Sequence, residues 1–133
     1  MRKHVVIAGG GAAGFFAAIN VASLCKNVRV TILEKSNKLL AKVRVSGGGR
    51  CNVTHGLYDA KLLTEKYPRG KKELINAFHR FNPTQTVEWF AERGVKLKTE
   101  EDGRMFPVTD NSQTIIDCFL REAEKYNIEI PNV

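Results

Sequence analysis

The feature that most constrains the fold is a run of glycines between an apolar strand and a helix. Residues 4–8 are His-Val-Val-Ile-Ala, a short run typical of a strand buried on both faces, and residues 9–14 are Gly-Gly-Gly-Ala-Ala-Gly. Good helix formers follow over 12–24, and residues 28–34 alternate as a second strand. A strand, a tight turn, a helix and a strand within about thirty residues form a βαβ unit with a right-handed crossover. The sequence therefore predicts an α/β fold with a parallel sheet.

The glycine run also matches G-x-G-x-x-G, the pattern that binds the pyrophosphate of dinucleotides between a strand and a helix. Gly9 permits the tight turn, Gly11 leaves no Cβ between backbone and pyrophosphate, and Gly14 lets the helix pack closely on the strand. Glu34 ends the second strand, where its carboxylate is placed to accept hydrogen bonds from a ribose diol and to repel a 2′-phosphate. The alternative is an ordinary glycine-rich turn with Glu34 as a solvated strand end. The residues expected to hold the nucleotide are Gly9, Gly11, Ala12, Ala13, Gly14 and Glu34.

A second glycine-rich run covers residues 46–54, Ser-Gly-Gly-Gly-Arg-Cys-Asn-Val-Thr. Three glycines before Arg50 let the backbone approach an anion, and the guanidinium can bind that anion with two donors. A flexible loop is the alternative. Cys51 is either a redox thiol whose pKa Arg50 lowers, or a small packing residue.

The net charge of +7 is concentrated at one end of the chain. Residues 1–50 contain nine Lys or Arg and one acid, a net charge of +8, whereas residues 51–133 contain twelve Lys or Arg and thirteen acids. Such asymmetry is typical of a local site for a polyanion, either a nucleic acid or a small phosphate compound. We expect the phosphate compound, because the basic residues are not interleaved with aromatic ones and no RNA-binding signature is present.

Three cysteines, Cys25, Cys51 and Cys118, show neither a CxxC pair nor a metal-ligand spacing. A disulfide framework and a structural zinc are therefore not expected, and both Cys25 and Cys118 are predicted to lie in or near the core on helices. The uncharged run over 5–24 follows a basic start like that of a signal peptide, but it contains four glycines and Asn20. We expect a cytoplasmic protein without a membrane segment.

The middle of the chain predicts two helices and a β-hairpin. Residues 71–81 have the spacing of an amphipathic helix. Asn82 is a predicted cap before a helix that starts at Pro83 and ends at Gly94, with Trp89 and Phe90 in the core. The segments 95–99 and 104–108 then form a predicted hairpin around a two-residue Asp102-Gly103 turn, a third amphipathic helix follows, and Ile128–Ile130 begins a returning strand.

Four segments together resemble one known family, the bacterial BaiN/RdsA flavoproteins, which are NAD(P)/FAD-dependent oxidoreductases also called aminoacetone-oxidase-like. These segments are 9–14, Glu34-Lys35, 46–54 and 102–107. The Ser-Gly-Gly-Gly-Arg-Cys-Asn run is the most specific, because generic dinucleotide folds lack it. The resemblance covers nearly the whole chain.

The resemblance implies an FAD cofactor, with its adenosine half at the first glycine turn and its pyrophosphate or flavin near the second. It adds NAD(P)H or an amine as possible electron donors, and it leaves the substrate and any catalytic residue unassigned. The further cofactor-site residues that it implies are Lys35, Lys42, Gly48, Gly49, Arg50, Cys51 and Asn52. A non-catalytic nucleotide-binding module is the alternative function.

The expected organisation is the N-terminal part of an FAD-binding domain, with an incomplete parallel sheet and an inserted helical and hairpin segment. Residues 1–54 hold the βαβ unit and the second glycine run, 55–110 hold helices and the hairpin, and 111–133 hold a helix and the start of the returning strand. Leu40 stands where many family members have glycine, which leaves the shape of the 38–45 loop open. Family members are also several times longer and complete the flavin site with distant segments. We therefore expect residues 1–133 alone to bind FAD weakly or not at all and to show negligible turnover, with the remainder of the same protein or another copy completing the site.

Overall fold

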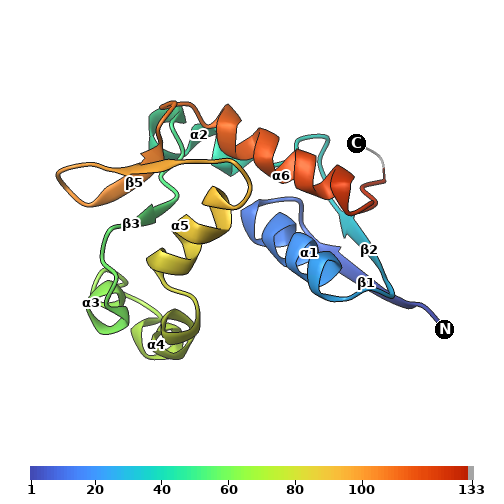
Figure 1. Cartoon of the computed structure of the whole chain (residues 1–133), viewed down its shortest axis with the longest axis horizontal. Helices are drawn as coiled ribbons and strands as arrows, with labels where there is room; N and C mark the ends of the chain where they lie inside the picture. Colours follow the sequence, from blue (N-terminus) through green and yellow to red (C-terminus); the bar gives the residue numbers. More distant parts are fainter. Residues whose placement is uncertain (132–133) are drawn as a thin grey trace.

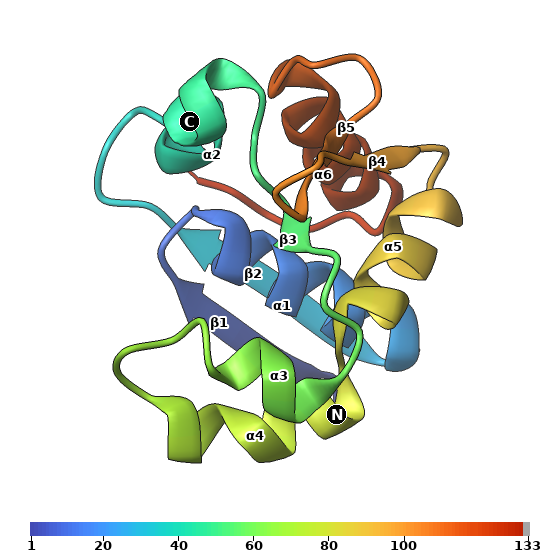
Figure 2. The same cartoon turned by 90° about the vertical axis from the view of Figure 1, so that its left-hand side faces the viewer.

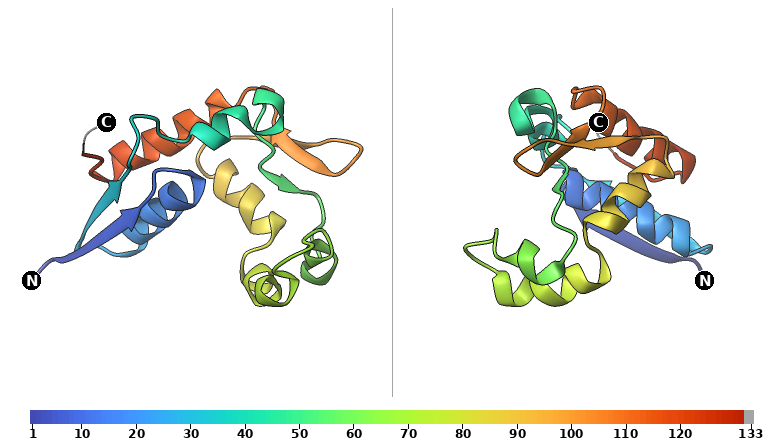
Figure 3. Two further views of the ribbon diagram at one scale, coloured as in Figure 1. Left: turned by 180° about the vertical axis from the view of Figure 1, so that it is seen from behind. Right: turned by 60° about the vertical axis from the view of Figure 1, so that its left-hand side comes forward.

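A computed structural model describes residues 1–131 (Figure 1). In chain order its elements are β1 (Lys3–Ala8), α1 (Ala12–Leu24), β2 (Val28–Leu33), α2 (Ala41–Gly49), β3 (Thr54–His55), α3 (Ala60–Thr64), α4 (Lys71–Arg80), α5 (Pro83–Ala91), β4 (Leu97–Thr99), β5 (Arg104–Pro107) and α6 (Gln113–Lys125). The two helices α3 and α4 lie at the opposite end of the molecule from the N-terminus (Figures 1 and 3). Helices and a parallel strand pair confirm the predicted α/β class.

The predicted βαβ unit is present at the N-terminus. β1 and β2 pair in parallel from Lys3 beside Val28 to Ala8 beside Leu33. The predicted returning strand over 128–130 is present only as an isolated parallel bridge between Glu129 and Thr31, on the side of β2 away from β1. Glu129 donates its N–H to Val30 O at 2.9 Å, and its carbonyl accepts from Ile32 N–H at 2.8 Å.

β1 differs from the expected strand buried on both faces. Within residues 1–131 it pairs only with β2, and the Val6 side chain is 52% exposed. Helix α1 covers one face of the pair, so Val5 and Ile7 on that face are half-buried while Val6 points to the other. A uniformly apolar run does not show which face a helix will cover, because side chains alternate along every strand.

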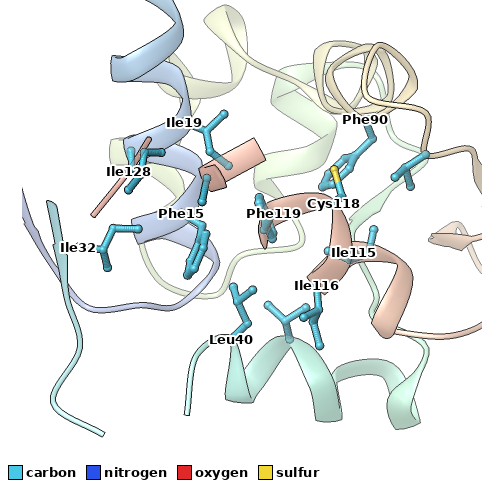
Figure 4. Close-up of a cluster of buried hydrophobic side chains, with 14 of the residues drawn as sticks. Phe15, Ile19, Ile32, Leu40, Phe90, Ile115, Ile116, Cys118, Phe119 and Ile128 are labelled. Carbon is cyan, nitrogen blue, oxygen red and sulfur yellow. The ribbon is translucent and has the colours of Figure 1, made fainter. Parts of the chain in front are cut away.

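The core lies between α1, β2 and α6 (Figure 4). Phe15 and Ile19 of α1 and Ile32 of β2 are completely buried, and the Phe15 ring centroid lies 6.0 Å from that of Phe119 on α6. Trp89 and Phe90 of α5 join this cluster and confirm their predicted core positions. The packing fixes where α1 begins and therefore where its first turn points.

The helix ends follow the predicted signals. The Asn82 side chain accepts from Thr84 N–H at 2.7 Å, and Gln85 closes the capping box at 2.8 Å, with Pro83 at the first helical position. α5 ends at Ala91 in a turn that closes at Gly94. α6 ends at Lys125, and the turn after it contains Asn127 at φ +52° and closes with Ile128 N–H donating to Ala123 O at 2.9 Å. Local sequence was sufficient here because each cap involves residues adjacent in the chain.

The hairpin and the Cys25 side chain differ from prediction. The hairpin turn is not the predicted two-residue Asp102-Gly103 type but a three-residue loop over 101–103. Glu100 N–H donates to Arg104 O at 2.8 Å and closes this loop. The hairpin sheet also contains a third strand, β3, which pairs antiparallel with β5 and which the sequence analysis does not predict. Cys25 is exposed rather than near the core, since it follows the last turn of α1, whereas Cys118 is buried as expected.

Phe15→Ala tests the assignment of the core. Removing a fully buried ring should lower the free energy of unfolding by about 3–5 kcal/mol, which urea titration would measure. The matched control is Leu24→Ala on the same helix, an exposed position where the change should stay within about 0.5 kcal/mol. Equal effects of the two variants would contradict this core.

Candidate functional site

The first glycine turn is closed by backbone contacts that leave no room for a side chain at Gly14. Gly9 has φ +104° and donates its N–H to Leu33 O at 2.7 Å. A Cβ on Gly14 would lie 2.0 Å from Gly9 O, so only glycine allows α1 to start this close to β1. Gly14 therefore has the packing role that the motif predicts.

Gly11 lies on the open side of the same turn. Its φ of −92° suits any residue, and a Cβ built there would have no atom within 4 Å. It is the N-cap of α1 and provides no side-chain cap, while Ala12 and Ala13 behind it are exposed. The first N–H groups of a helix lack intrahelical partners and carry a partial positive charge, so this end can accept an anion.

Glu34 lies directly beside this turn. Its carboxylate accepts from Gly10 N–H at 2.8 Å through Oε2 and from Ser36 N–H at 2.9 Å through Oε1. These backbone donors, Ser36 first and Gly10 second, lower the pKa of Glu34, so the group is ionised at neutral pH. Each carboxylate oxygen has a second lone pair, which leaves acceptor capacity for a ribose diol.

Gly10 has a role that the sequence analysis did not assign. A Cβ there would lie 2.7 Å from Leu39 Cδ2 and 3.2 Å from the Glu34 Cβ. Gly10 O also accepts from Leu40 N–H at 2.8 Å, which joins the first turn to the start of α2. The available signal was a glycine at the second position of G-x-G-x-x-G, where the motif accepts any residue.

The second glycine run is an ordered kink rather than a flexible loop. The segment expected as a loop over 38–45 is helical from Ala41 onwards, and Leu40 before it adopts φ +55°, a conformation that favours the glycine seen in the resembling family. The helix then breaks at Ser46, and Gly47, Gly48 and Gly49 all have positive φ. Three glycines are required because few other residues tolerate that conformation.

Arg50, expected to bind an anion, contacts carboxylates of the protein itself. Its Nη1 donates to Glu100 Oε1 at 2.6 Å and to Asp110 Oδ1 at 3.4 Å, and its Cζ lies 3.8 Å from the centroid of the Phe106 ring. The Glu100 hydrogen bond is the main cause that raises the pKa of Arg50. Two carboxylates therefore already balance this charge, and an anion contact through its other N–H groups stays a prediction.

Cys51 is a packing residue in this structure. It is buried with φ +64°, and burial raises the pKa of its thiol, with a Ser46 hydrogen bond opposing that shift. Of the two alternatives for Cys51, the structure favours the packing residue, because the Arg50 guanidinium is directed towards the hairpin carboxylates and does not lower the pKa of the thiol.

Both glycine runs line one cavity of about 460 Å³ (Figure 2 shows α2 above the start of α1). The first run contributes Ala12 and Ala13, and the second contributes Ser46, Cys51 and Asn52. Lys42 supplies the positive charge at its edge. The remaining wall is mostly apolar and consists of Phe16, Val43, Val53, Phe81, Thr86, Phe90, Ile115 and Phe119.

Three other residues predicted for the site do not line this cavity: Lys35, Gly48 and Gly49. A Cβ on Gly48 or Gly49 would meet no atom within 4 Å. Lys35 is exposed after Glu34 and does not line the cavity. A neighbouring pocket of about 440 Å³ shares Asn52, Val53, Phe81 and Thr86 with the first and extends to residues of α3 and α4. Residues 1–131 contain no cluster of His, Cys, Asp or Glu that could hold a metal ion, and no helix long and apolar enough to cross a membrane.

Glu34→Gln should remove a stabilisation that depends on pH. Because the folded-state pKa of Glu34 is lowered, its contribution is present above the unfolded pKa of about 4.3 and is lost as pH falls through the folded value. The stability difference between wild type and Glu34→Gln should therefore be constant near neutrality and shrink below about pH 4. Urea titrations across pH would show this, and a difference that grows in acid would contradict it.

The three thiols should react in a defined order. Cys25 is exposed and should react first with a disulfide reagent, whereas the buried Cys51 and Cys118 should react only after unfolding, giving three thiols in denaturant without reductant. The raised pKa of Cys51 means that its thiolate forms only above the usual thiol range. Cys25→Ser should abolish the fast phase, and a fast phase that survives in this variant would show Cys51 to be reactive.

Comparison with known proteins finds one matching family along nearly the whole chain. The family described as HI0933-like protein Rossmann domain matches residues 3–132. The chain is 30% identical over 128 residues to the 3-dehydro-bile acid delta(4,6)-reductase of Clostridium scindens, which covers 96% of this chain and 30% of that protein. It is also similar to proteins named ribosomal RNA dihydrouridine synthase, at 30% identity in Haemophilus influenzae and 28% in Escherichia coli.

The three matches include 94–96% of this chain, and the chain spans about 30% of the length of each relative. The resemblance to BaiN/RdsA flavoproteins, drawn from the glycine runs, is thereby confirmed. A G-x-G-x-x-G turn joining parallel strands, a second glycine kink beside it and a match over residues 3–132 lead to one conclusion: the chain belongs to the HI0933-like Rossmann family.

Proposed function

We propose that this chain is the FAD-binding portion of a flavin-dependent oxidoreductase. The observation that carries the proposal is the shared cavity of about 460 Å³, because it joins a dinucleotide turn to a second glycine turn that dinucleotide folds do not require. One of the relatives is named as a reductase, which supports redox chemistry. The activity of the whole protein, its substrate and its electron donor, including NAD(P)H, belong to the proposal.

The cofactor is proposed to lie along the three features in order. Glu34 binds the adenosine ribose, the open backbone at Gly11–Ala13 binds the pyrophosphate, and the cavity takes the flavin ring. The fit rests on empty space: a Cβ at Gly11, Gly48 or Gly49 would meet no atom within 4 Å. When bound, FAD would supply the acceptor or donor of a hydride or electron pair.

The protein's own contribution is binding, orientation and exclusion of water. Phe16, Phe81 and Phe90 give the cavity an apolar wall, while Lys42 and the α1 N-terminus favour negative charge at its edge. Cys51 packs in that wall and does not act as a redox thiol in this proposal. In this proposal, part of the positive charge of residues 1–50 serves to bind the phosphates of the cofactor. The expectation that the protein binds no nucleic acid stays a prediction, although two relatives are named for ribosomal RNA.

Gly11→Val tests the proposed pyrophosphate contact. The variant should fold with little loss of stability, because φ at Gly11 is −92° and no atom lies near the added Cβ, yet it should abolish FAD binding. The measurement is the visible absorption of the intact protein, purified with excess FAD and passed through gel filtration, together with titration of the flavin-free form.

Gly14→Ala is the comparison variant. Its Cβ would clash with Gly9 O, so stability and binding should fall together, whereas Gly11→Val separates them. Glu34→Ala should weaken FAD by about tenfold, the value of one lost charge-assisted hydrogen bond. Colourless wild-type protein that FAD does not titrate would leave the non-catalytic nucleotide module as the function, and unchanged FAD affinity in Gly11→Val would reject this binding mode.

A further inference from the structure

Arg50 connects the second glycine turn to the β4–β5 hairpin through one buried ring. Phe106 of β5 has no exposed surface, and the Arg50 guanidinium covers its face at 3.8 Å. The same ring fills the space beside Gly47, where an added Cβ would lie 2.7 Å from Phe106 Cε1. Phe106 thus lies against both ends of the kink.

The charged end of Arg50 makes a second set of contacts with the hairpin. Nη1 bonds to Glu100, which follows β4, and to Asp110, which follows β5 and also accepts from Lys98 Nζ at 2.6 Å. The arginine and Glu100 side chains are each about one-third exposed, so solvent weakens this pair without removing it. A planar guanidinium that stacks and pairs at once has one orientation, which lysine cannot reproduce.

The backbone on either side of the kink is held by further hydrogen bonds. Ser112 N–H donates to Gly49 O at 2.8 Å, Ser112 Oγ donates to Arg44 O at 2.9 Å, and Val53 N–H donates to Met105 O at 2.9 Å. Between these points the chain runs through Gly48, Gly49 and Cys51, all with positive φ. Glycines add the most chain entropy to the unfolded state, so this stretch needs a strong local contact to keep one shape.

We propose that Arg50 is a positioning residue, which fixes the turn over 46–52 against the hairpin and so holds the cavity wall in the shape that the flavin requires. This inference rests on the proposed FAD site. It assigns to the arginine of the glycine run a role within the protein, acting through the backbone of Gly48–Asn52 and not through contact with the cofactor. The hairpin becomes part of the binding site although it does not line the cavity.

The test compares four variants of the intact protein by two measurements. Amide hydrogen exchange of peptides over 46–52, in flavin-free protein, reports the turn, and titration with FAD reports the site. Arg50→Met and Glu100→Gln should each speed amide exchange over 46–52 and lower the affinity for FAD by about tenfold. This is the factor for losing a charge-assisted hydrogen bond or a stacked cation. Arg50→Lys should recover part of both losses.

The matched control is Arg104→Met. Arg104 also lies over Phe106, at 5.3 Å, and pairs with Asp102 on the same hairpin, but it makes no contact with the turn over 46–52 in the described part of the chain. It should change neither measurement. Exchange over α6 should stay the same in all four variants, which shows that the core remains folded.

Glu100→Gln distinguishes positioning from direct contact, because it leaves the arginine in place and removes only the negative charge of its nearer carboxylate partner. Unchanged or tighter FAD binding in Glu100→Gln, or weaker binding in Arg50→Met with unchanged exchange, would overturn the proposal in favour of a direct anion contact. Faster exchange without weaker FAD binding would overturn it as well, as would an equal effect of Arg104→Met. If wild-type protein binds no FAD, the proposed function fails, and unchanged exchange in Arg50→Met would additionally reject the contact itself.

Discussion

The contact between Gly14 and Gly9 O is the constraint on which the rest of the site depends. Because no Cβ separates them, α1 starts against the end of β1 and its first N–H groups face open space. The position of Glu34 follows from the same turn, since Gly10 N–H binds its carboxylate. A larger residue at Gly14 would move the helix and with it every contact proposed for the nucleotide.

The hydrogen bond from Leu40 N–H to Gly10 O extends this constraint to the second glycine turn. It places α2 beside α1, so residues more than thirty positions apart line one cavity. Leu40 is almost fully buried in a left-handed conformation, which costs a residue with a side chain roughly 1–2 kcal/mol. Burial of its side chain in the core offsets that cost.

The site combines a rigid half with a half that depends on side-chain pairing. The first turn is supported by the α1, β2 and α6 core, where Phe15 and Ile32 are completely buried. The second is a chain of residues with positive φ, supported by the Phe106 ring and by charges that solvent reaches. Salt should therefore affect the two halves differently, because it screens exposed ion pairs more than buried apolar contacts.

The local sequence was enough to determine the βαβ unit, the capped helix after Asn82 and the dinucleotide turn, because the residues that signal each of them lie close together in the chain. Sequence alone also located both glycine runs and Glu34. It did not determine where Arg50 points, that Cys51 is buried, that β1 has an exposed face or that Thr54–His55 forms a strand. Each of these depends on a partner far along the chain, such as Glu100, fifty residues after Arg50. Such contacts follow from how helices and hairpin pack, so only the tertiary structure decides them.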